Sequence, residues 1–514
     1  MEDKVYVNSI NDSQMRISSY GQTKTPEMNF DTADIVFALV AIVLGFLYWN
    51  FIDLYMLGAG VTIFALLMFA ASFVYLNKSG FKQNAKSLVC LTLATASAIQ
   101  LTLFDNQFIS FLNFIFLKLT FIYWICLSTG RQLEKNLSVY VIGDAFKQIL
   151  SIPFSNFGCC KSGIAKGLSK PKKAKGVTAA FVGLLIFFPL IVVVINLLMS
   201  ADLAFENFVI GFLNRFDMAR VFQYILYFLF GIPVAFYLYG LIYGNKTGRY
   251  SEKITAQSVD NTAKSVKIAP RVTIYTVMTA FNFIYFVFFA VQANYLFSAF
   301  FGTLPQAFTY AEFARRGFFE LCAVAGINLG ILIIAHLAIK RESGEELKAL
   351  RIQTVIISIF TILMIVTAQS KMIMYINVFG LTQLRVFTSW FMILLFLIFT
   401  FILVRQFKKF NLTRFVVIGF VAMFMALSYS NVDGLIAKYN IERYQAGTLQ
   451  TLDIDALGRL SDAAVPHMHN LYITGEYDWR LVNAMSTFRW IPSESDFRTF
   501  NLQRHRANEI RARL

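Results

Sequence analysis

Charged side chains are scarce in this sequence: Asp, Glu, Lys and Arg together make up 15% of its 514 residues. A soluble domain usually holds about 25%. Apolar residues make up 57% of the chain. They recur in runs of about 20 residues, the length that an α-helix needs to cross a bilayer. This composition excludes an ordinary soluble protein, and the runs predict an all-α polytopic transmembrane bundle.

Cysteine and histidine, the residues that most often bind metals or act in catalysis, are also few. The chain holds five Cys and four His, and no Cys lies after residue 432, so a disulfide framework is not expected there. His467 and His469 are two positions apart and do not share a helix face. No Gly-rich phosphate loop or Ser-His-Asp arrangement is evident. We therefore expect no cofactor, no metal ion and no catalytic residue, and we favour a protein that is not an enzyme.

Eleven apolar runs are long enough to span a membrane. They cover residues 34–52, 54–76, 86–104, 107–128, 177–199, 220–243, 272–301, 317–339, 351–376, 384–404 and 412–431. Little more than Asp53 separates the first two runs, and Asp105 and Asn106 separate the third from the fourth. Each of these pairs is therefore expected to form a tight hairpin.

The distribution of Lys and Arg sets the expected orientation. With the N-terminus inside, the cytoplasmic segments hold 29 of these residues and the five outer connections hold five. Because positive charge concentrates in cytoplasmic loops, this split predicts a multipass membrane protein with a cytoplasmic N-terminus and an extracytoplasmic C-terminus. Topology explains the net charge of +16, so nucleic acid is not an expected partner.

Five regions follow from this topology. They are a polar cytoplasmic N-terminus (1–33), four N-terminal spans in two hairpins (34–128), a basic cytoplasmic loop (129–176), a seven-helix transmembrane region (177–432) and a small extracytoplasmic helical tail (433–514). Within the tail, Asp453 and Ser461 are the expected N-caps of two short helices.

The basic loop has two parts. Apolar residues recur at helical spacing in the first part: Val139, Ile142, Phe146, Ile149 and Leu150. This spacing predicts a helix that lies on the inner membrane face. The second part, KSGIAKGLSKPKKAKG, is either a solvated flank of the spans or a contact for anionic lipid headgroups. Membrane lipids are expected partners, and the cytoplasmic loops and the exterior tail are candidate surfaces for a protein partner.

Ionisable residues within or beside the spans are candidates for a site, because a charge in the hydrocarbon region is costly. The stretch YAEFARRGFFEL (310–321) runs into the eighth span with charges at i,i+3 and i,i+4 spacing. On the derived topology seven residues share the outer membrane level. We expect them to form a polar cluster: Asp202, Glu312, Arg315, Arg316, Glu320, Lys371 and Arg385.

Glu320 is the central member of this cluster. A charged pair at i,i+4 spacing contributes only about 0.2–0.5 kcal/mol in water, whereas placing a charged group in lipid costs about 2–4 kcal/mol. Glu320 is therefore expected to point into the bundle, towards Arg316, Lys371 or Arg385. Two interpretations stay open: a site for a substrate, headgroup or proton, and an ion pair that fixes helix packing.

Two more ionisable residues lie within predicted spans. Lys118 falls in the middle of the fourth run and is expected either to snorkel or to pair with an acid. His336 falls near the inner end of the eighth run, where we expect a hydrogen bond to the backbone.

Four blocks carry a family resemblance: LLMSADLAF (197–205), NYLFSAFFGTLPQAFTYAEFARRGFFEL (294–321), FGLTQLRVFTSWFM (379–392) and NVDGLIAKYNIERY (431–444). In their order and spacing they resemble a bacterial membrane-protein family, domain of unknown function 4173, related to domain of unknown function 4153. The resemblance covers roughly residues 175–510 and leaves the first four spans outside. It implies a bacterial multipass protein and brings no activity, cofactor or catalytic residue.

Three functions are compatible with these observations. A sensor or accessory component of the bacterial cell envelope fits the folded tail, the basic loops and the lack of catalytic groups. A transporter or channel-like protein would use the outer polar cluster. A lipid-linked transferase would use Asp53 as the acidic residue of its first outer loop, although that loop is very short. We favour the first function because it requires the least chemistry.

Overall fold

The computed structural model describes most of the chain. The described residues are 28–168, 194–195, 197–213, 217–250, 254–300, 318–340, 347–475, 479–486 and 496–514. Within these parts the regular secondary structure is helical, and a single isolated bridge joins Ala269 to Ile339. The all-α fold expected from the sequence is therefore confirmed.

Ten of the described helices are long and apolar enough to cross a membrane. They are α2 (Thr32–Phe51), α3 (Ala59–Lys78), α4 (Ala85–Leu103), α5 (Gln107–Thr129), α11 (Met218–Thr247), α13 (Arg271–Phe300), α15 (Phe318–Ala338), α16 (Lys348–Phe379), α17 (Gln383–Phe407) and α18 (Leu412–Tyr429). Each coincides with a predicted span, which confirms the polytopic bundle. The predicted span 177–199 lies largely outside the described residues.

Polar residues mark the beginnings of several spans. Asp31 and Asp34 form a reciprocal capping box before α2, and Asn84 begins another before α4. Asn106 caps α5 by accepting a hydrogen bond from the amide of Ile109 at 2.9 Å. These side chains satisfy N–H groups that the first turn of a helix leaves unpaired. Because the capping residue lies in the connection itself, a span can begin directly after a short connection.

The N-terminal lobe comprises α2–α5 and α11. Contact is most extensive between α2 and α11, where a Cβ atom added to Gly45 would lie 2.2 Å from the carbonyl oxygen of Gly231. At the end of these helices, Lys246 Nζ lies 2.5 Å from a carboxylate oxygen of Asp34, and the hydroxyl of Tyr75 donates to the same carboxylate at 2.6 Å. The buried charge of Asp34 is thus paired, and it joins three helices.

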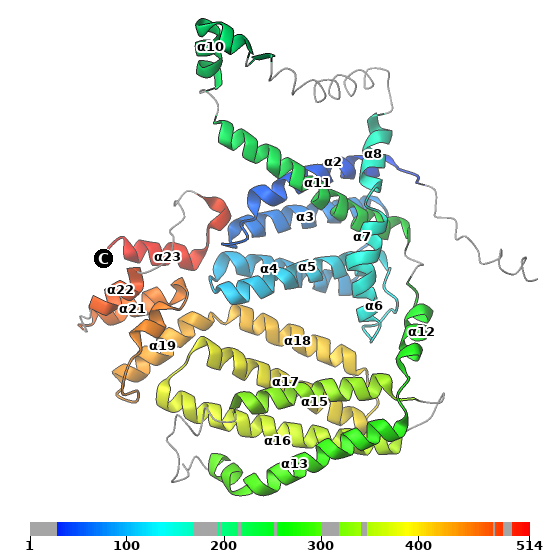
Figure 1. Ribbon diagram of the computed structural model, residues 1–514, viewed down its shortest axis with the longest axis vertical. Coiled ribbons are helices and arrows are strands. Elements are labelled where there is room, and N and C mark those ends of the chain that lie inside the picture. Colours follow the sequence, from blue (N-terminus) through cyan, green and yellow to red (C-terminus); the bar gives the residue numbers. More distant parts are fainter. Residues whose placement is uncertain are drawn as a thin grey trace, which may run out of the picture.

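The C-terminal lobe comprises α13, α15, α16 and α17. A chain of buried polar side chains crosses its core: Tyr285 donates to Asn328, whose amide donates to Thr361 Oγ1 at 2.8 Å. Hydrogen bonds of this kind hold spans together in lipid, where the hydrophobic effect does not. Helix α18 packs on α17 and also contacts α4 and α5, so it lies between the two lobes (Figure 1).

The appendage is the helical C-terminal region. It contains α19 (Val432–Gln445), α20 (Ile454–Gly458), η3 (Asp462–Ala464), α21 (Val465–Ile473), α22 (Trp479–Ser486), η4 (Phe497–Thr499) and α23 (Leu502–Arg511). Leu457, Met468 and Leu481 are buried in an apolar core of its own. The appendage is therefore a small folded unit, as the sequence predicts for a helical tail.

One of the two predicted N-caps in this region is correct. Asp453 caps α20, because its carboxylate accepts from the amide of Ala456 at 2.8 Å. Ser461 precedes the 3-10 turn η3 and its side chain makes no capping bond. The next helix begins only at Val465, with Pro466 in its first turn, since proline fits where the amide has no partner.

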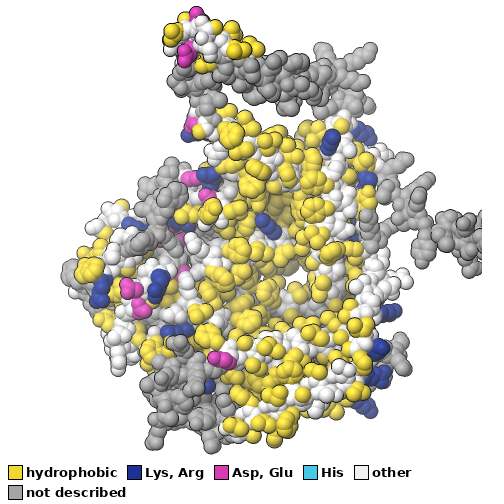
Figure 2. Space-filling view, viewed as in Figure 1, with side chains coloured by type: hydrophobic (Ala, Val, Ile, Leu, Met, Phe, Trp, Pro, Cys, Tyr) yellow, Lys and Arg dark blue, Asp and Glu magenta, His cyan; other side chains and the backbone are white. Residues whose placement is uncertain are grey.

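The two ends of the bundle carry different elements (Figure 1). The appendage covers one end, which we name the appendage face. The other end, named the opposite face, carries α6 (Val141–Phe146), η1 (Lys147–Ser151), α7 (Ile152–Ser155), α8 (Cys159–Leu168) and α12 (Ala256–Val266). Apolar side chains cover the spans between these ends, and Lys and Arg gather towards the ends (Figure 2).

Candidate functional site

The seven residues of the predicted polar cluster do not form one group among the described residues. Glu312, Arg315 and Arg316 lie outside the described residues. Glu320 lies in the first turn of α15 and is exposed, whereas Lys371 of α16 is buried. Their charges are close enough to interact. Glu320 thus acts on the charge of Lys371, but its exposed side chain does not point into the bundle as expected. The choice between a site and an ion pair stays a prediction.

Arg385 binds backbone carbonyls at the C-terminal end of α16. Its guanidinium donates to the carbonyl oxygens of Phe379, at 3.1 Å, and Gly380, and it lies 4.2 Å from the ring centre of Tyr375. A cation at a helix C-terminus complements both the unpaired carbonyls and the helix dipole. Arg385 therefore fixes the turn between α16 and α17.

Asp202 is separate from the rest of the predicted cluster. Its carboxylate accepts from the amide of Phe205 at 2.7 Å and so caps α10 (Leu203–Leu213). Figure 1 shows α10 well away from α15 and α16. A shared membrane level, which is all that topology supplies, does not bring residues of distant helices into contact.

The remaining ionisable residues of the spans have local partners. Lys118 donates to the hydroxyl of Tyr48 at 3.4 Å, and its ammonium lies 4.0 Å from the ring centre of Phe114. His336 donates through Nδ1 to the carbonyl of Leu332 in its own helix at 2.9 Å. The expected backbone bond of His336 is therefore confirmed. Lys118 gains a cation–π contact with Phe114, a partner that its local sequence does not predict.

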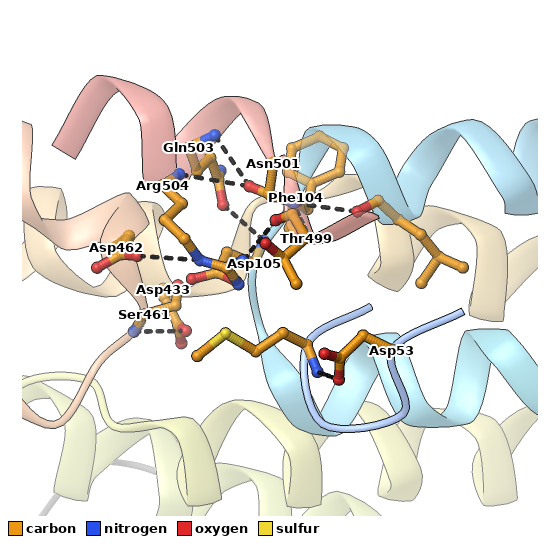
Figure 3. A network of polar contacts seen from close by, with 12 residues as sticks. Asp53, Phe104, Asp105, Asp433, Ser461, Asp462, Thr499, Asn501, Gln503 and Arg504 are labelled. Carbon is orange, nitrogen blue, oxygen red and sulfur yellow. Dashed lines mark hydrogen bonds and ion pairs between the residues drawn. The ribbon is translucent and has the colours of Figure 1, made fainter. Parts of the chain in front are cut away.

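A different polar network stands out at the appendage face (Figure 3). We name it the clasp; it consists of Asp105, Asn106, Gln383, Asp433, Ser461, Asp462, Asn501, Gln503 and Arg504. Its three aspartates are between 1% and 4% exposed. Because a buried charge is costly unless it is paired or hydrogen-bonded, the partners of each aspartate determine what the clasp does.

Arg504 of α23 is the cation of the clasp. Its guanidinium pairs with Asp105, in the turn between α4 and α5, and its Nε lies 3.8 Å from a carboxylate oxygen of Asp462. It also donates to the carbonyl of Thr499 at 2.6 Å. Arg511 supplies a second positive charge, because it donates to Asp462 at 2.7 Å. Arg504 thus joins a turn of the N-terminal lobe to two elements of the appendage (Figure 3).

Asp433 of α19 binds three neutral donors. The side-chain amides of Asn106 and Gln383 donate to it at 2.9 and 2.7 Å, and the backbone amide of Ser461 donates at 3.0 Å. Asn106 belongs to the N-terminal lobe, Gln383 to the C-terminal lobe and Ser461 to the appendage. One carboxylate therefore joins all three parts of the protein.

Asn501 and Gln503 complete the contact with α4. The amide of Asn501 donates to the carbonyl oxygens of Leu101 and Phe104, both at 3.0 Å. Gln503 accepts from the backbone amide of Asp105 at 2.9 Å. The bonds from Asn501 satisfy carbonyls at the end of α4, and Gln503 satisfies the amide of the turn that follows. The appendage is therefore seated on the helix end itself.

The appendage also holds the end of α16. Arg443 of α19 donates to the carbonyls of Ile376 and Asn377, at 3.3 and 2.8 Å. Asn440 exchanges two hydrogen bonds with the backbone of Leu381, at 2.7 and 2.9 Å. Arg443 and Arg385 thus bind carbonyls at the C-terminus of α16, the longest described helix, and Asn440 holds the turn that follows it.

Asp53, the acidic residue of the first connection, is also engaged locally. Its carboxylate accepts from the amides of Tyr55 and Met56 at 2.8 and 3.1 Å, which forms an Asx turn. The amide of Ala59 donates to the carbonyl of Phe500 at 2.8 Å, so the appendage lies against this connection. This arrangement gives no support to a transferase site at Asp53.

Sequence reasoning identified the hairpin residues of the clasp but not their partners. Asp105 and Asn106 are conspicuous as the short polar break between two apolar runs, and the basic end NLQRHRANEIRARL contains Arg504. Arg504 and Asp105 are separated by 399 positions. No local pattern links residues so far apart, so the sequence does not predict their pairing.

The described fold and clasp define a class of protein: a multipass α-helical integral membrane protein with a helical appendage docked on one face. Residues 85–471 match the domain of unknown function DUF4153, and the chain belongs to this family. Comparisons with curated proteins and with solved structures found no match.

The family match corrects the expected extent of the resemblance. Of the two families that the sequence blocks suggest, the match is to domain of unknown function 4153. The match begins at residue 85, so α4 and α5 belong to the family region and only the first two spans precede it. It ends at residue 471, within α21. Asp105, Asp433 and Asp462 therefore lie inside the family region, and Arg504 lies beyond it.

Proposed function

We propose that this protein is a sensor or accessory component of the bacterial cell envelope, with its appendage outside the cytoplasm. The observation that carries the proposal is the clasp, which fastens the appendage to both lobes at once. Asp433 binds Asn106 of one lobe and Gln383 of the other. A partner or signal that displaces the appendage therefore acts on both lobes, and such coupling between distinct parts is what a sensor requires.

The distribution of basic residues supports the orientation. The cytoplasmic segments of this topology hold 29 Lys and Arg, against five in the outer connections. Ser486 of α22 and Lys135 of the opposite face are both exposed. We expect a membrane-impermeant maleimide to label Ser486→Cys in intact cells and Lys135→Cys only after permeabilisation. The reverse pattern would overturn the orientation and the extracytoplasmic role together.

A partner is best sought at the exposed rim of the appendage. Trp479 and Ile473 are large apolar side chains, 74% and 60% exposed. We expect a photo-crosslinking amino acid at either position to form one defined adduct in native membranes, and affinity purification to recover the same protein in stoichiometric amount. A crosslinker at exposed Glu509 of α23 is the matched control. Recovery of no stoichiometric partner would count against an accessory role.

A transporter or channel-like protein is the second candidate. Two observations favour it: Lys371 is a buried charge within a span, interacting with Glu320, and the lobes are separate helix groups joined mainly through α18 and the appendage. Flux through reconstituted vesicles is the test. Equal flux for the wild-type protein, Glu320→Gln and Lys371→Met would exclude a role for this pair in transport.

A further inference from the structure

The segment 139–157 crosses the opposite face as a bent helical elbow. It includes α6, the π-helical turn η1 and α7, and it follows α5. Helix α7 is seated closely on α11: Cβ atoms added to Gly240 and Gly244 would lie 2.5 Å from Pro153 O and 2.6 Å from Ile152 Cγ2. The elbow is therefore packed against a span and does not hang free.

One side of the elbow exposes a continuous apolar row. The row consists of Val139, Ile142, Phe146, Leu150 and Phe154, whose side chains are between 44% and 73% exposed. Their spacing of three or four residues places them on one helix face. In water this face would leave five large apolar side chains unburied within a single short segment.

The charged side chains of the elbow point the other way. Asp144 and Lys147 are the charged residues of this segment, and each is only 4% exposed. The amide of Leu133 donates to Asp144 at 2.9 Å, and Lys147 donates to the carbonyl of Arg131 at 3.1 Å. The polarity of the elbow is thus inverted relative to a helix on the surface of a soluble domain.

The buried side of the elbow also joins the ends of two spans. Gln148 and Asn245 of α11 exchange side-chain hydrogen bonds at 2.9 and 2.7 Å. Arg131, which follows α5, donates to the carbonyl of Asn245 at 3.0 Å. The elbow, the end of α5 and the end of α11 therefore form one hydrogen-bonded unit.

We propose that the apolar row of the elbow is immersed in the acyl-chain region of the leaflet at the opposite face, so that lipid is its partner. Charged side chains turned inward and apolar side chains turned outward minimise free energy only where the surroundings are apolar. The row also meets the surface of a span, because the ring of Phe154 lies edge-on to that of Tyr237 in α11, with 5.8 Å between the ring centres. The elbow thereby couples the packing of this leaflet to α5 and α11.

This inference goes beyond an interfacial position. An amphipathic helix on a membrane surface keeps its charges towards water, whereas the elbow uses Asp144 and Lys147 to bind the protein. The inference is also independent of the appendage and of the orientation of the chain. If the proposed envelope role is wrong, the elbow can still lie in lipid. If the elbow does not lie in lipid, the description of the clasp is unaffected.

Spin labelling of the full-length protein in phospholipid vesicles tests the inference. Cys322, the half-buried native thiol, is replaced by Ser, since the other four native thiols are buried. Single labels are then placed by Phe146→Cys or Leu150→Cys, with Glu134→Cys, an exposed polar position just before the elbow, as the matched control. Collision rates with oxygen, which partitions into lipid, and with a water-soluble nickel chelate are measured for each label.

The expected result is a severalfold higher collision rate with oxygen than with nickel at positions 146 and 150, and the opposite ratio at position 134. Nickel-dominated collisions along the row would place it in water and overturn the proposal. Low collision rates with both reagents would show a protein partner or a second copy on the row, and would also overturn it. If one labelled variant fails to reconstitute, Ile142→Cys reports on the same face.

Discussion

The two faces of the bundle join the lobes in different ways. At the appendage face the links are buried and charged, with Asp105 and Asp433 at most 4% exposed. At the opposite face the links run from the region after α5 to α12 and α18, the helices between the lobes, and they are exposed: Tyr140 donates to Asp260 of α12 at 2.6 Å, and Asn411, the N-cap of α18, donates to the carbonyl of Leu137 at 2.8 Å. Buried links resist opening more than exposed ones, so the lobes are held firmly at one face and loosely at the other.

The largest effect is expected from removing the cation of the clasp. Arg504→Ala removes the cation that Asp105 and Asp462 share, and breaking a buried ion pair in this way costs about 3–5 kcal/mol. We expect much faster hydrogen exchange in α23 and in the turn between α4 and α5. Arg506→Ala is the control, because Arg506 is an exposed arginine of the same helix. Equal exchange in both variants would show that the clasp is not a buried ion pair.

A smaller effect is expected from replacing Asp433, the carboxylate that accepts hydrogen bonds from three neutral donors. Asp433→Asn keeps the shape but replaces a carboxylate that accepts three hydrogen bonds with a group that also carries two donors. Unsatisfied buried groups of this kind cost about 1–3 kcal/mol. Hydrogen exchange at Ser461 and in α19 should rise, while Asp455→Asn, at an exposed position, should leave it unchanged. Unchanged exchange in Asp433→Asn would contradict the joining role of this residue.

Acidification should weaken the appendage modestly. Burial lowers the pKa of His467, with a further contribution from Lys438, so the folded appendage prefers the neutral imidazole. Stability is therefore complete above the ordinary pKa of about 6.5 and falls as the pH drops from there through the lowered value. Hydrogen exchange of α21 between pH 7.5 and 5.5 should show this loss. His467→Gln should flatten the profile, and the exposed His505→Gln should not.

The smallest effect is expected at the opposite face. Tyr140→Phe removes an exposed hydrogen bond to Asp260, which contributes at most about 1 kcal/mol. A double-mutant cycle with Asp260→Asn measures the coupling through exchange of α12. A coupling as large as that of Arg504 with Asp105 would remove the contrast between the two faces.

The spans could be predicted because each is a local property of its own sequence. Apolar runs of about 20 residues locate helices without knowledge of their neighbours, and ten of the predicted runs are helices in the structure. The helical spacing of Val139, Ile142 and Phe146 was likewise sufficient to predict the elbow as a helix. Its π-helical turn was not predicted, because spacing alone does not distinguish it.

The contacts between charges could not be predicted in the same way. Arg385 was assigned to a cluster from its membrane depth, yet it caps α16 through the carbonyls of Phe379 and Gly380. The sequence predicts how deep a side chain lies in the membrane, but its position within the membrane plane depends on how the helices pack. The partners of Asp433 come from three parts of the chain for the same reason.

The position of Arg504 along the chain has a consequence for biosynthesis. A ribosome synthesises both lobes before it reaches α23, which lies 399 residues after the aspartate that Arg504 binds. The turn between α4 and α5 therefore gains its arginine partner only near the end of translation. Docking of α23 on that turn is therefore among the last steps of assembly, and a chain interrupted before α23 would join the lobes through Asp433 but would lack the ion pair between Arg504 and Asp105.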